Sequence, residues 1–387
     1  MMTYDWIIIG AGISGASLAY ELSQQKFKVL VLEKDPIPDN ATVYSYGGLA
    51  YWSGTDELTR QLGREGIELH RQLTEELGQD TEFRELDLVL TIDRDADPQA
   101  IAKTYDRFAT KPQLLSVKEA CELEPLLNPD AIAGCLQLPH GHIHAQKTTE
   151  VYLQACLRNG GEIKYERAID FVRDNQRILG VETKLNTYYA ANTIVCAGGL
   201  TRSLLLQTGI EVDNYFTHAQ LITTPPVKLE LQTIVMPAIQ QRFALEAAAR
   251  DLVFDNGKEK NEARSILDAG VVQFLDGSLC LGQISTITSN PHAKFDAAAE
   301  EAKIRQQVNN ILPALEKIPG TYHHCLVAFN DRAIALAGKL QPFTGIQLFS
   351  GFTSTLVFAP ILARRFARWL AGEADAIIEQ LAKKIEK

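Results

Sequence analysis

Glycines near the start of the chain have the spacing of a phosphate-binding turn. Gly10, Gly12 and Gly15 form the pattern G-x-G-x-x-G between an apolar run and a stretch with helical periodicity. The first glycine permits a tight turn, the second lets the backbone approach a pyrophosphate, and the third lets the helix pack on the strand. The start of such a helix presents unpaired N–H groups and the positive end of the helix dipole. This pattern therefore predicts a dinucleotide-binding site.

Glu33 strengthens that prediction. It follows the next β-rich run, where a carboxylate can accept hydrogen bonds from ribose hydroxyls. The same carboxylate would repel the 2′-phosphate of NADP, whereas FAD and NAD both remain compatible with it. The alternative is a glycine turn in an ordinary α/β sheet, which the combination of strand, glycines, helix and carboxylate disfavours.

The elements that must position these residues form a βαβ unit. Residues 6–9 are apolar and predict a strand, residues 13–22 follow helical spacing, and residues 27–32 predict a second strand. We therefore expect the nucleotide-binding domain to begin at the N-terminal end of this sequence.

The rest of the chain mixes helices and strands, and we expect an α/β protein. Predicted helices cover residues 56–77, 116–128, 148–159, 200–207 and 297–311 and a long segment from Ala359 onward. Predicted strands cover residues 86–92, 134–138, 162–165, 193–197 and 346–349. Residues 215–285 are rich in strand patterns, with a polar interruption at residues 255–262, and predict a second, antiparallel lobe.

Composition and charge limit the possible partners. The chain has 387 residues, of which 46% are hydrophobic and 22% charged, as in a globular protein with room for two lobes. Its formal net charge of −10 disfavours binding to nucleic acid or to an anionic membrane surface, because both need clustered basic side chains. We therefore expect a small-molecule substrate and no nucleic acid partner.

The sequence also predicts the cellular location of the protein and whether it binds a metal. The first strand leaves no room for an export signal, and the apolar stretch at residues 356–362 contains Pro360 and is too short to span a membrane. The six cysteines are scattered without paired spacing, which favours reduced thiols in the cytoplasm. We predict no metal site. The histidines that lie close to one another in sequence are interpreted as loop residues or as neighbours on opposite sides of a strand: His140, His142, His144, His323 and His324.

Several separated segments resemble one enzyme family. The opening DWIIIGAGISGASLAYELSQQKFKVLVLEK and the segment NTIVCAGGLTRSLL resemble its FAD domain, and LSVKEACELEPLL followed by GHIHAQKTTEVYLQAC resembles the connection back into that domain. The loop ATVYSYGGLAYWSG, the hairpin DGSLCLGQIS and the closing LFSGFTSTLVFAPILARRFARWLAG resemble segments near its flavin and substrate. Over nearly its whole length the chain resembles the FAD-dependent family of D-amino-acid oxidase, glycine oxidase and sarcosine oxidase.

The resemblance implies a fold and a set of cofactor contacts. It implies a Rossmann-like FAD-binding domain with an interleaved antiparallel-sheet substrate domain, and a noncovalent FAD. By carry-over, Ala168 would contact the adenine side, Ala197 and Gly198 would line the dinucleotide, and residues 351–356 would face the isoalloxazine. The implied FAD-binding residues are Gly10, Gly12, Ile13, Ser14, Gly15, Glu33, Lys34, Ser45, Gly47, Gly48, Ala168, Ala197, Gly198, Gly351, Thr353, Ser354, Thr355 and Leu356.

The same resemblance suggests how the domains divide. We expect residues 1–84, 145–214 and 325–387 to form the FAD-binding domain, and residues 85–144 and 215–324 to form the substrate domain.

The chain departs from the family at positions that bind substrate or promote reaction with oxygen. Ala328 and Phe329 stand where many relatives have an arginine-proline pair, and Arg332 is displaced from that place. Sarcosine-type relatives have basic residues in the loop beside the flavin, in the closing turn and in the hairpin. The corresponding positions in this chain are Ala50, Phe358 and Cys280. An amino-acid substrate is therefore less secure, and a dehydrogenase that uses an acceptor other than oxygen becomes plausible.

Two further residues have competing interpretations. Arg242 could recruit an anionic substrate, but a solvated surface arginine is the favoured interpretation. Cys325 lies near the position of the cysteine that links to flavin in sarcosine oxidase, but an inert buried thiol is favoured.

The resemblance implies hydride transfer from an amine-bearing carbon to the flavin, followed by hydrolysis of an imine. No general base is strictly required, and we assign no catalytic residue. The electron acceptor, oxygen or another compound, and the oligomeric state stay open. The alternatives are a 2-hydroxy-acid dehydrogenase and a noncatalytic flavin-binding sensor or assembly protein.

Overall fold

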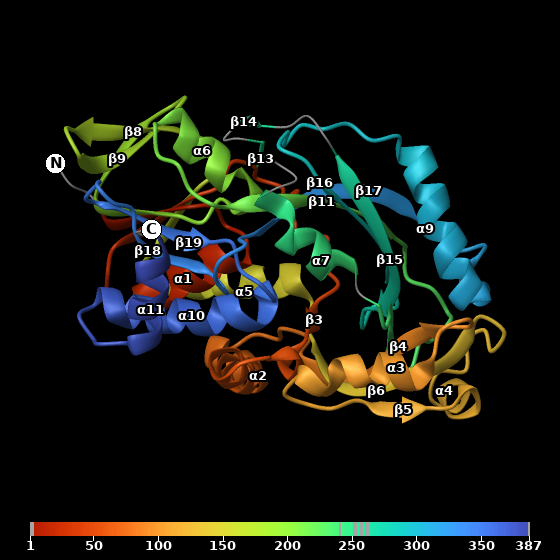
Figure 1. The fold of residues 1–387 in the computed structure, drawn as a ribbon. Helices are drawn as coiled ribbons and strands as arrows, with labels where there is room; N and C mark the ends of the chain where they lie inside the picture. Colours follow the sequence, from red (N-terminus) through yellow and green to blue (C-terminus); the bar gives the residue numbers. More distant parts are fainter. Residues whose placement is uncertain (1–3, 240, 251–253, 256–257, 260–262, 386–387) are drawn as a thin grey trace.

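The fold is given by a computed structural model, which describes residues 4–239, 241–250, 254–255, 258–259 and 263–385 (Figure 1). The predicted polar stretch at residues 255–262 therefore lies largely outside the described residues. Within the described part, the chain forms two large sheets that are covered by helices and face one another across a cavity.

The first sheet is mainly parallel and contains the predicted βαβ unit. Its strand order is β18-β19-β10-β1-β2-β7, and only β18 runs antiparallel to its neighbour on this path. A hairpin of β8 and β9 extends β10. The bounds are β1 Tyr4–Ile9, β2 Val29–Leu32, β7 Glu162–Lys164, β8 Ala168–Asp174, β9 Arg177–Thr183, β10 Thr187–Val195, β18 Leu336–Lys339 and β19 Ile346–Ser350.

The two faces of this sheet pack against different elements, because alternate strand residues point to opposite sides. Helices cover one of these faces. Trp6 and Ile8 pack with α1, α5 and α10, whereas Ile7 and Ile9 pack with the β8–β9 hairpin and α6. Further helices α2 and α11 complete the helical layer (Figure 1). The bounds are α1 Ile13–Gln24, α2 Glu57–Leu77, α5 Ala145–Arg158, α6 Thr201–Gln207, α10 Thr355–Leu370 and α11 Ala376–Ile385.

The second sheet is antiparallel apart from the pairing of β12 with β4. Its order is β17-β11-β16-β15-β12-β4-β6-β3, with β5 beside β6. The strand bounds are β3 Gly48–Leu49, β4 Arg84–Asp93, β5 Gln113–Leu115, β6 Ile132–His142, β11 Tyr215–Thr223, β12 Ile234–Pro237, β15 Arg264–Gln273, β16 Leu279–Ile287 and β17 Thr321–Phe329.

Smaller elements surround the second sheet. Helix α9 packs on β15 and β16 through a separate apolar core that includes Ile304 and Val308. The remaining bounds are α3 Pro98–Thr104, α4 Val117–Leu123, α7 Gln241–Ala247, α9 Ala297–Ile311, η1 Tyr51–Ser53, η2 Tyr105–Arg107, η3 Gly198–Leu200, η4 Pro313–Leu315, β13 Phe254–Asp255 and β14 Lys258–Glu259.

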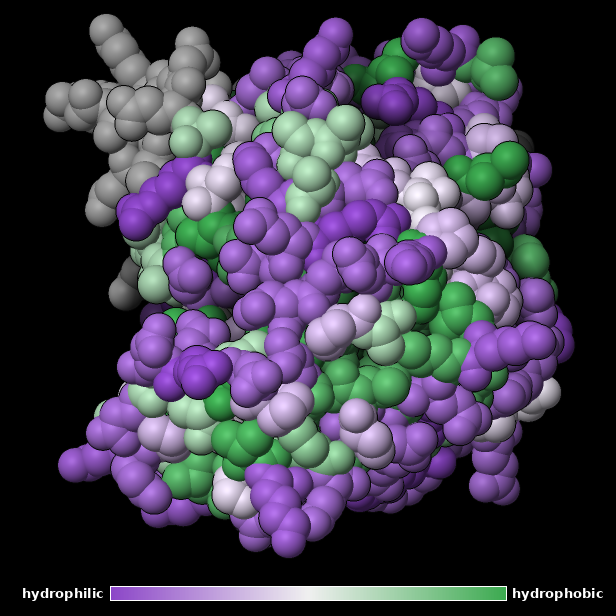
Figure 2. Space-filling view, turned by 90° about the vertical axis from the view of Figure 1, so that its right-hand side faces the viewer, coloured by the Kyte–Doolittle hydropathy of each residue, from purple (hydrophilic) through white to green (hydrophobic). Residues whose placement is uncertain are grey.

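The mixed α/β class with a second antiparallel sheet is confirmed. The domain boundaries stay a prediction: β17 crosses residue 325, and β3 belongs to the second sheet although it precedes residue 85. Polar side chains cover much of the face that is seen in Figure 2, with apolar side chains gathered between them.

Three predicted helices have wrong boundaries, and proline explains one of them. Helix α5 begins at Ala145 rather than Thr148. Helix α4 ends at Leu123, because Glu124 is extended and precedes Pro125. Helix α10 begins at Thr355 rather than near Ala359 and carries Pro360 inside it.

The histidines expected in loops are also placed differently. His140 and His142 lie on β6 and are buried, and His144 caps the start of α5. Burial lowers the pKa of both strand histidines to about 3, so both rings are neutral near pH 7.

Candidate functional site

A cavity of about 1710 Å³ lies between the two sheets and contacts both. Its wall contains the glycine turn of β1 and α1, and also strands β11, β12, β15 and β17 of the second sheet. Because ordinary ligand pockets occupy roughly 300–1,000 Å³, this cavity has room for a dinucleotide and a small second molecule.

The glycine turn has the geometry that its sequence predicts. Gly10 has a φ of +105°, and a Cβ there would lie 2.5 Å from the carbonyl oxygen of Cys196. A Cβ on Gly15 would collide with the carbonyl oxygen of Gly10, so this glycine serves helix packing. Helix α1 follows with no side-chain cap, and the Ile13 N–H donates to Thr42 Oγ1 at 3.1 Å. The start of α1 therefore faces the cavity.

Glu33 stands beside this turn at the end of β2. Its carboxylate is buried and accepts the Ala11 N–H at 2.8 Å and the Asp35 N–H at 3.2 Å. These bonds hold the side chain in the cavity wall, and each carboxylate oxygen keeps acceptor capacity for a hydroxyl. This arrangement suits a ribose.

Two later turns complete the nucleotide side of the wall. Gly198 has a φ of +54°, and no atom lies within 4 Å of the position that its Cβ would take. Residues 351–356 lead into α10 and also line the cavity, with Ser354 in the left-handed region at a φ of +44°. Glycine and polar residues thus leave the backbone open to a ligand.

The structure brings nearly all of the predicted FAD-binding residues to one cavity. The exceptions are Gly15, which packs α1 on β1, and Gly47, whose position faces the Ile143 carbonyl. The residues that line the cavity are Gly10, Gly12, Ile13, Ser14, Glu33, Lys34, Ser45, Gly48, Ala168, Ala197, Gly198, Gly351, Thr353, Ser354, Thr355 and Leu356.

These residues fit FAD. The open space at Gly198 leaves room for a ligand, the start of α1 can donate to a pyrophosphate, and Glu33 can accept from a ribose. The cavity then continues past residues 351–356 to the second sheet, where a flavin and a substrate can meet.

Aromatic side chains form part of the wall on the second sheet's side. Trp52 lies edge-on to Phe108, with ring centroids 5.4 Å apart, and 6.2 Å from Tyr105. The Trp52 Nε1–H donates to His140 Nδ1 at 3.0 Å, so the proton of this neutral imidazole is on Nε2. His140 is therefore a hydrogen-bond donor rather than a base.

Three charged residues line one end of the cavity, together with Tyr46: Arg242, Glu246 and Asp268. We call these four residues the α7 end of the cavity. Arg242 Nε lies 3.3 Å from Glu246 Oε1, one helical turn along α7. Asp268 on β15 accepts the backbone N–H groups of Gln241 and Arg242, each at 3.2 Å. Burial raises the pKa of both carboxyl groups.

The Tyr46 hydroxyl at this end is buried and has no hydrogen-bond partner among the described residues. Burial raises its pKa well above the ordinary value, with smaller contributions from Cys280, Arg242 and Asp268. The Tyr46 side chain lines the cavity, and a buried hydroxyl without a partner gains a hydrogen bond when a ligand reaches it.

The interpretation of Arg242 as a solvated surface arginine stays a prediction. Its side chain is 35% exposed and lies in the cavity wall, where it pairs with Glu246. Arg332, by contrast, pairs with Asp213 at 2.8 Å and does not line the cavity. The displaced arginine is therefore directed elsewhere.

The positions that differ from the family have apolar or neutral side chains. Ala328, Phe329, Ala50 and Phe358 line the cavity, whereas Cys280 is buried in the second sheet. Cys325 also lines the cavity and is buried, and burial raises the pKa of its thiol to about 12. The prediction of a buried thiol at Cys325 is confirmed, and its lack of reactivity stays a prediction.

Of the α7 end and the aromatic wall, only Arg242 was a candidate from the sequence. Tyr46 and Trp52 lie in the loop ATVYSYGGLAYWSG, so this resemblance could have drawn attention to them. Helix α7 lies within residues 215–285, which were predicted to be rich in strands. Asp268 is distant from this helix in sequence and contacts it only in the folded chain. No local pattern joins these residues.

None of the helices that the structure describes is long and apolar enough to cross a membrane. The described residues also contain no group of three or more His, Cys, Asp or Glu that could hold a metal ion.

Comparison with known proteins gives a family match over most of the chain. The model of the DAO family, described as FAD dependent oxidoreductase, matches residues 5–369.

Individual relatives and structures are distant but extensive. Glycine oxidase of Geobacillus kaustophilus is 27% identical over 362 residues, covering 89% of this chain and 91% of the relative. The formaldehyde-forming 4-methylaminobutanoate oxidase of Paenarthrobacter nicotinovorans is 25% identical over 375 residues, covering 94% of this chain but 43% of the longer relative. The crystal structure of the Geobacillus glycine oxidase superposes with a TM-score of 0.80 at 18% identity, over 97% of this chain and 96% of that one.

Proposed function

The chain belongs to the DAO family of FAD-dependent oxidoreductases, and we propose that it oxidises a small amine or amino acid. The observation that carries the proposal is the single cavity that joins the nucleotide-binding turns of the first sheet to the polar and aromatic wall of the second. Relatives that are named glycine oxidase and 4-methylaminobutanoate oxidase act on compounds of this class, which supports the choice of substrate.

The chain's own residues would bind and orient the cofactor. Gly10, Gly12 and the start of α1 would hold the pyrophosphate, Glu33 would accept from ribose, and residues 351–356 would lie along the isoalloxazine. FAD, when bound, supplies a flavin ring that accepts a hydride from the substrate carbon. The protein contributes position and electrostatics.

The wall near the substrate favours a neutral amine without a general base. An amine needs its nitrogen lone pair while the neighbouring carbon loses a hydride, so it reacts in the unprotonated form. His140 cannot take up that proton easily, because its Nδ1 already accepts from Trp52 and burial lowers its pKa to about 3. Substrate would therefore lose its proton to water before the redox step.

The acceptor that reoxidises the flavin is a compound other than oxygen in this proposal. A cation beside the flavin would stabilise the negative charge that develops as oxygen is reduced. Ala50 and Phe358 offer none in the cavity wall, and Cys280 is a buried thiol. Reduced enzyme should therefore turn yellow again slowly in air and rapidly with an artificial electron acceptor.

We further propose that the FAD is noncovalent and that the protein works in the cytoplasm. The high pKa of the Cys325 thiol disfavours the thiolate that a covalent link would need. All six cysteines are free, in keeping with a reducing compartment.

Anaerobic mixing of the purified holoenzyme with a panel of compounds tests the reaction class. We expect a primary or N-methyl amine, or an amino acid, to bleach the flavin absorbance. Bleaching by 2-hydroxy acids alone would replace the proposal with alcohol oxidation. No bleaching by any member of a broad panel would favour a noncatalytic flavoprotein.

A further inference from the structure

Among the described residues that define the α7 end of the cavity, the carboxylates outnumber the guanidinium groups. Arg242 is paired with Glu246, and the Asp268 carboxylate is held 3.2 Å from the backbone of the same helix turn. One guanidinium thus stands beside two carboxylates. Arg107, also in the wall, is exposed to solvent, where its charge is screened.

These charges select against an anion. A substrate carboxylate placed beside Arg242 would also approach Glu246 and Asp268, which repel it. A positively charged group would instead offset the excess negative charge and make charge-assisted hydrogen bonds with the carboxylates. Burial raises the pKa of both acids, and a nearby cation would lower it again.

The neighbouring side chains also suit a cation. Tyr46 presents a buried hydroxyl that has no partner among the described residues and can accept a hydrogen bond from an ammonium group. The rings of Trp52 and Tyr105 line the same cavity, and aromatic faces attract ammonium groups. The face of Phe108 is already covered by the Arg107 guanidinium, which lies 4.8 Å from the ring centroid. Asp268 influences the pKa of both Tyr46 and Tyr105, so it lies close to both tyrosines.

We propose that the α7 end binds a second, positively charged group of the substrate, through Asp268, Glu246 and Tyr46. The substrate class is then a diamine or an amine with a basic side chain, in which one nitrogen is oxidised and the other is held as a cation. This inference rests on the proposed amine oxidation, and it names the part of the substrate that does not react.

The first test compares compounds that share a four-carbon chain. Anaerobic flavin reduction is followed with 1,4-diaminobutane, butylamine and 4-aminobutanoate. We expect the largest kcat/KM for the diamine and the smallest for the amino acid. A larger value for 4-aminobutanoate than for the diamine would overturn the inference while leaving amine oxidation intact.

Asp268→Asn removes the charge and keeps one of the two acceptors, because the carboxylate accepts the Gln241 N–H on Oδ1 and the Arg242 N–H on Oδ2, whereas an asparagine has a single carbonyl oxygen. We expect the ratio of kcat/KM for 1,4-diaminobutane over butylamine to fall about tenfold or more. Asp276→Asn, in the turn that follows β15 and outside the cavity, is the matched control and should leave that ratio unchanged. An equal ratio in wild type and Asp268→Asn would contradict the inference.

Calorimetry on the oxidised holoenzyme tests the site without turnover. Butyltrimethylammonium has no nitrogen lone pair and cannot react, and pentanoate is an anion of similar length. We expect the cation to bind more tightly than the anion, and Asp268→Asn to weaken its binding about tenfold. Tighter binding of pentanoate would overturn the inference. A cation that binds as expected, in a protein that no amine reduces, would instead place the failure in the proposed reaction.

Discussion

Gly198 provides a direct residue-level test of the nucleotide cradle. Its φ of +54° and the empty space around its Cβ position allow an asparagine, which tolerates the left-handed region, to project into the cavity. We predict that Gly198→Asn lowers FAD affinity by at least tenfold, as measured by titration of the apoprotein.

Gly209 supplies the control for this substitution. It has a φ of +79°, has no atom within 4 Å of its Cβ position and does not line the cavity. Gly209→Asn should match Gly198→Asn in thermal stability without FAD and should bind FAD normally. Equal FAD affinity in the two variants would show that the cofactor does not pass Gly198.

Arg332, unlike Arg242, does not line the cavity and should be unnecessary for substrate binding. Arg332 pairs with Asp213 outside the cavity, so Arg332→Ala should leave KM for the best amine substrate within about twofold. Because this ion pair is about one-third exposed, the variant should lose no more than about 1 kcal/mol of stability. A KM that rises tenfold or more would place Arg332 on the substrate.

Residues of the cofactor site were predictable because their signal is local. The glycines and Glu33 occupy fixed places in one strand–turn–helix–strand unit, and steric need ties each glycine to its position. The α7 end was not predictable, because Tyr46, Arg242 and Asp268 are far apart in sequence and meet only when β15 and α7 fold beside the cavity. Burial and hydrogen bonding between distant segments leave no pattern in a single sequence.

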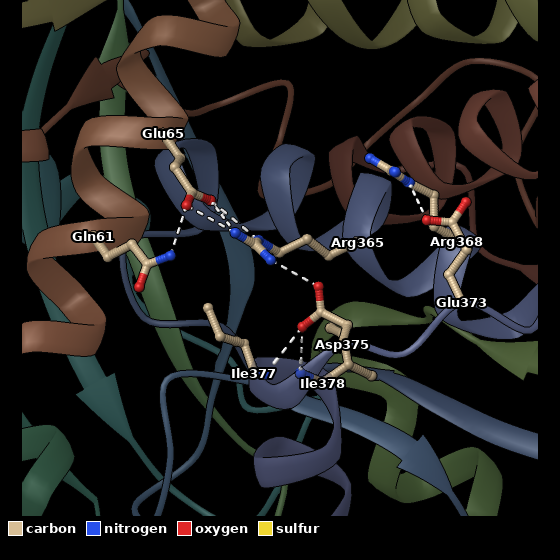
Figure 3. A network of polar contacts seen from close by, with 8 residues as sticks. All are labelled: Gln61, Glu65, Arg365, Arg368, Glu373, Asp375, Ile377 and Ile378. Atoms are coloured by element: carbon tan, nitrogen blue, oxygen red, sulfur yellow. Dashed lines mark hydrogen bonds and ion pairs between the residues drawn. The ribbon is translucent and has the colours of Figure 1, made fainter.

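At the scale of elements, Arg365 joins three helices at one point (Figure 3). From α10 it makes a two-pronged contact with Glu65 on α2, at 2.7 and 3.1 Å, and pairs with Asp375 at 2.7 Å. Asp375 in turn accepts the N–H groups of Ile377 and Ile378, at the start of α11. One guanidinium therefore fixes α11 against the rest of the helical layer.

We predict that Arg365→Met lowers the free energy of unfolding by about 2 kcal/mol, because charged hydrogen bonds in partly buried surroundings are lost. Chemical denaturation measures this change. Arg368→Met is the control: Arg368 also lies on α10, but its pair with Glu373 is more than half exposed and should contribute little. Equal losses in the two variants would argue against the network.

Elements with strong periodicity were predicted well, and those that depend on distant contacts were not. Helix α9 has the predicted bounds, because its apolar spacing is regular and Pro313 follows it. Helix α10 was predicted to begin at Ala359, but it begins at Thr355 and continues through Pro360. In the structure His70 donates from Nε2 to the Leu356 carbonyl at 2.8 Å, supplying the hydrogen bond that Pro360 cannot. A residue on α2 thus permits a proline inside α10.

At the scale of the whole molecule, buried neutral histidines should make the protein sensitive to acid. Burial lowers the pKa of His70 and His218 to about 4, and of His140 and His142 to about 3. In the unfolded chain each imidazole takes up a proton near pH 6.5. Because the folded pKa is the lower one, these histidines stabilise the fold above pH 6.5, and that stability is lost as pH falls toward 4.

His70 offers a test of this dependence, since it is fully buried and does not itself line the cavity. A shift to about 4 corresponds to about 3 kcal/mol lost between pH 6.5 and 4. His70→Gln retains a donor for Leu356 and cannot be protonated, so its unfolding free energy should fall less steeply over this range. Parallel pH profiles for the two proteins would contradict the assignment.

The two sheets meet around the cavity, so a bound cofactor would contact both. We therefore expect FAD to act as part of the core, and its removal to lower the melting temperature of the entire chain through binding linkage.

The identity and attachment of the cofactor test the central claim most directly. Purified protein is examined for the two-band flavin spectrum and then precipitated with acid, and the released compound is identified by chromatography. We predict a yellow protein that releases FAD into the supernatant at about one molecule per chain. A colourless protein that binds NAD would contradict the claim that this cavity holds FAD, and colour retained in the pellet would contradict its noncovalent attachment.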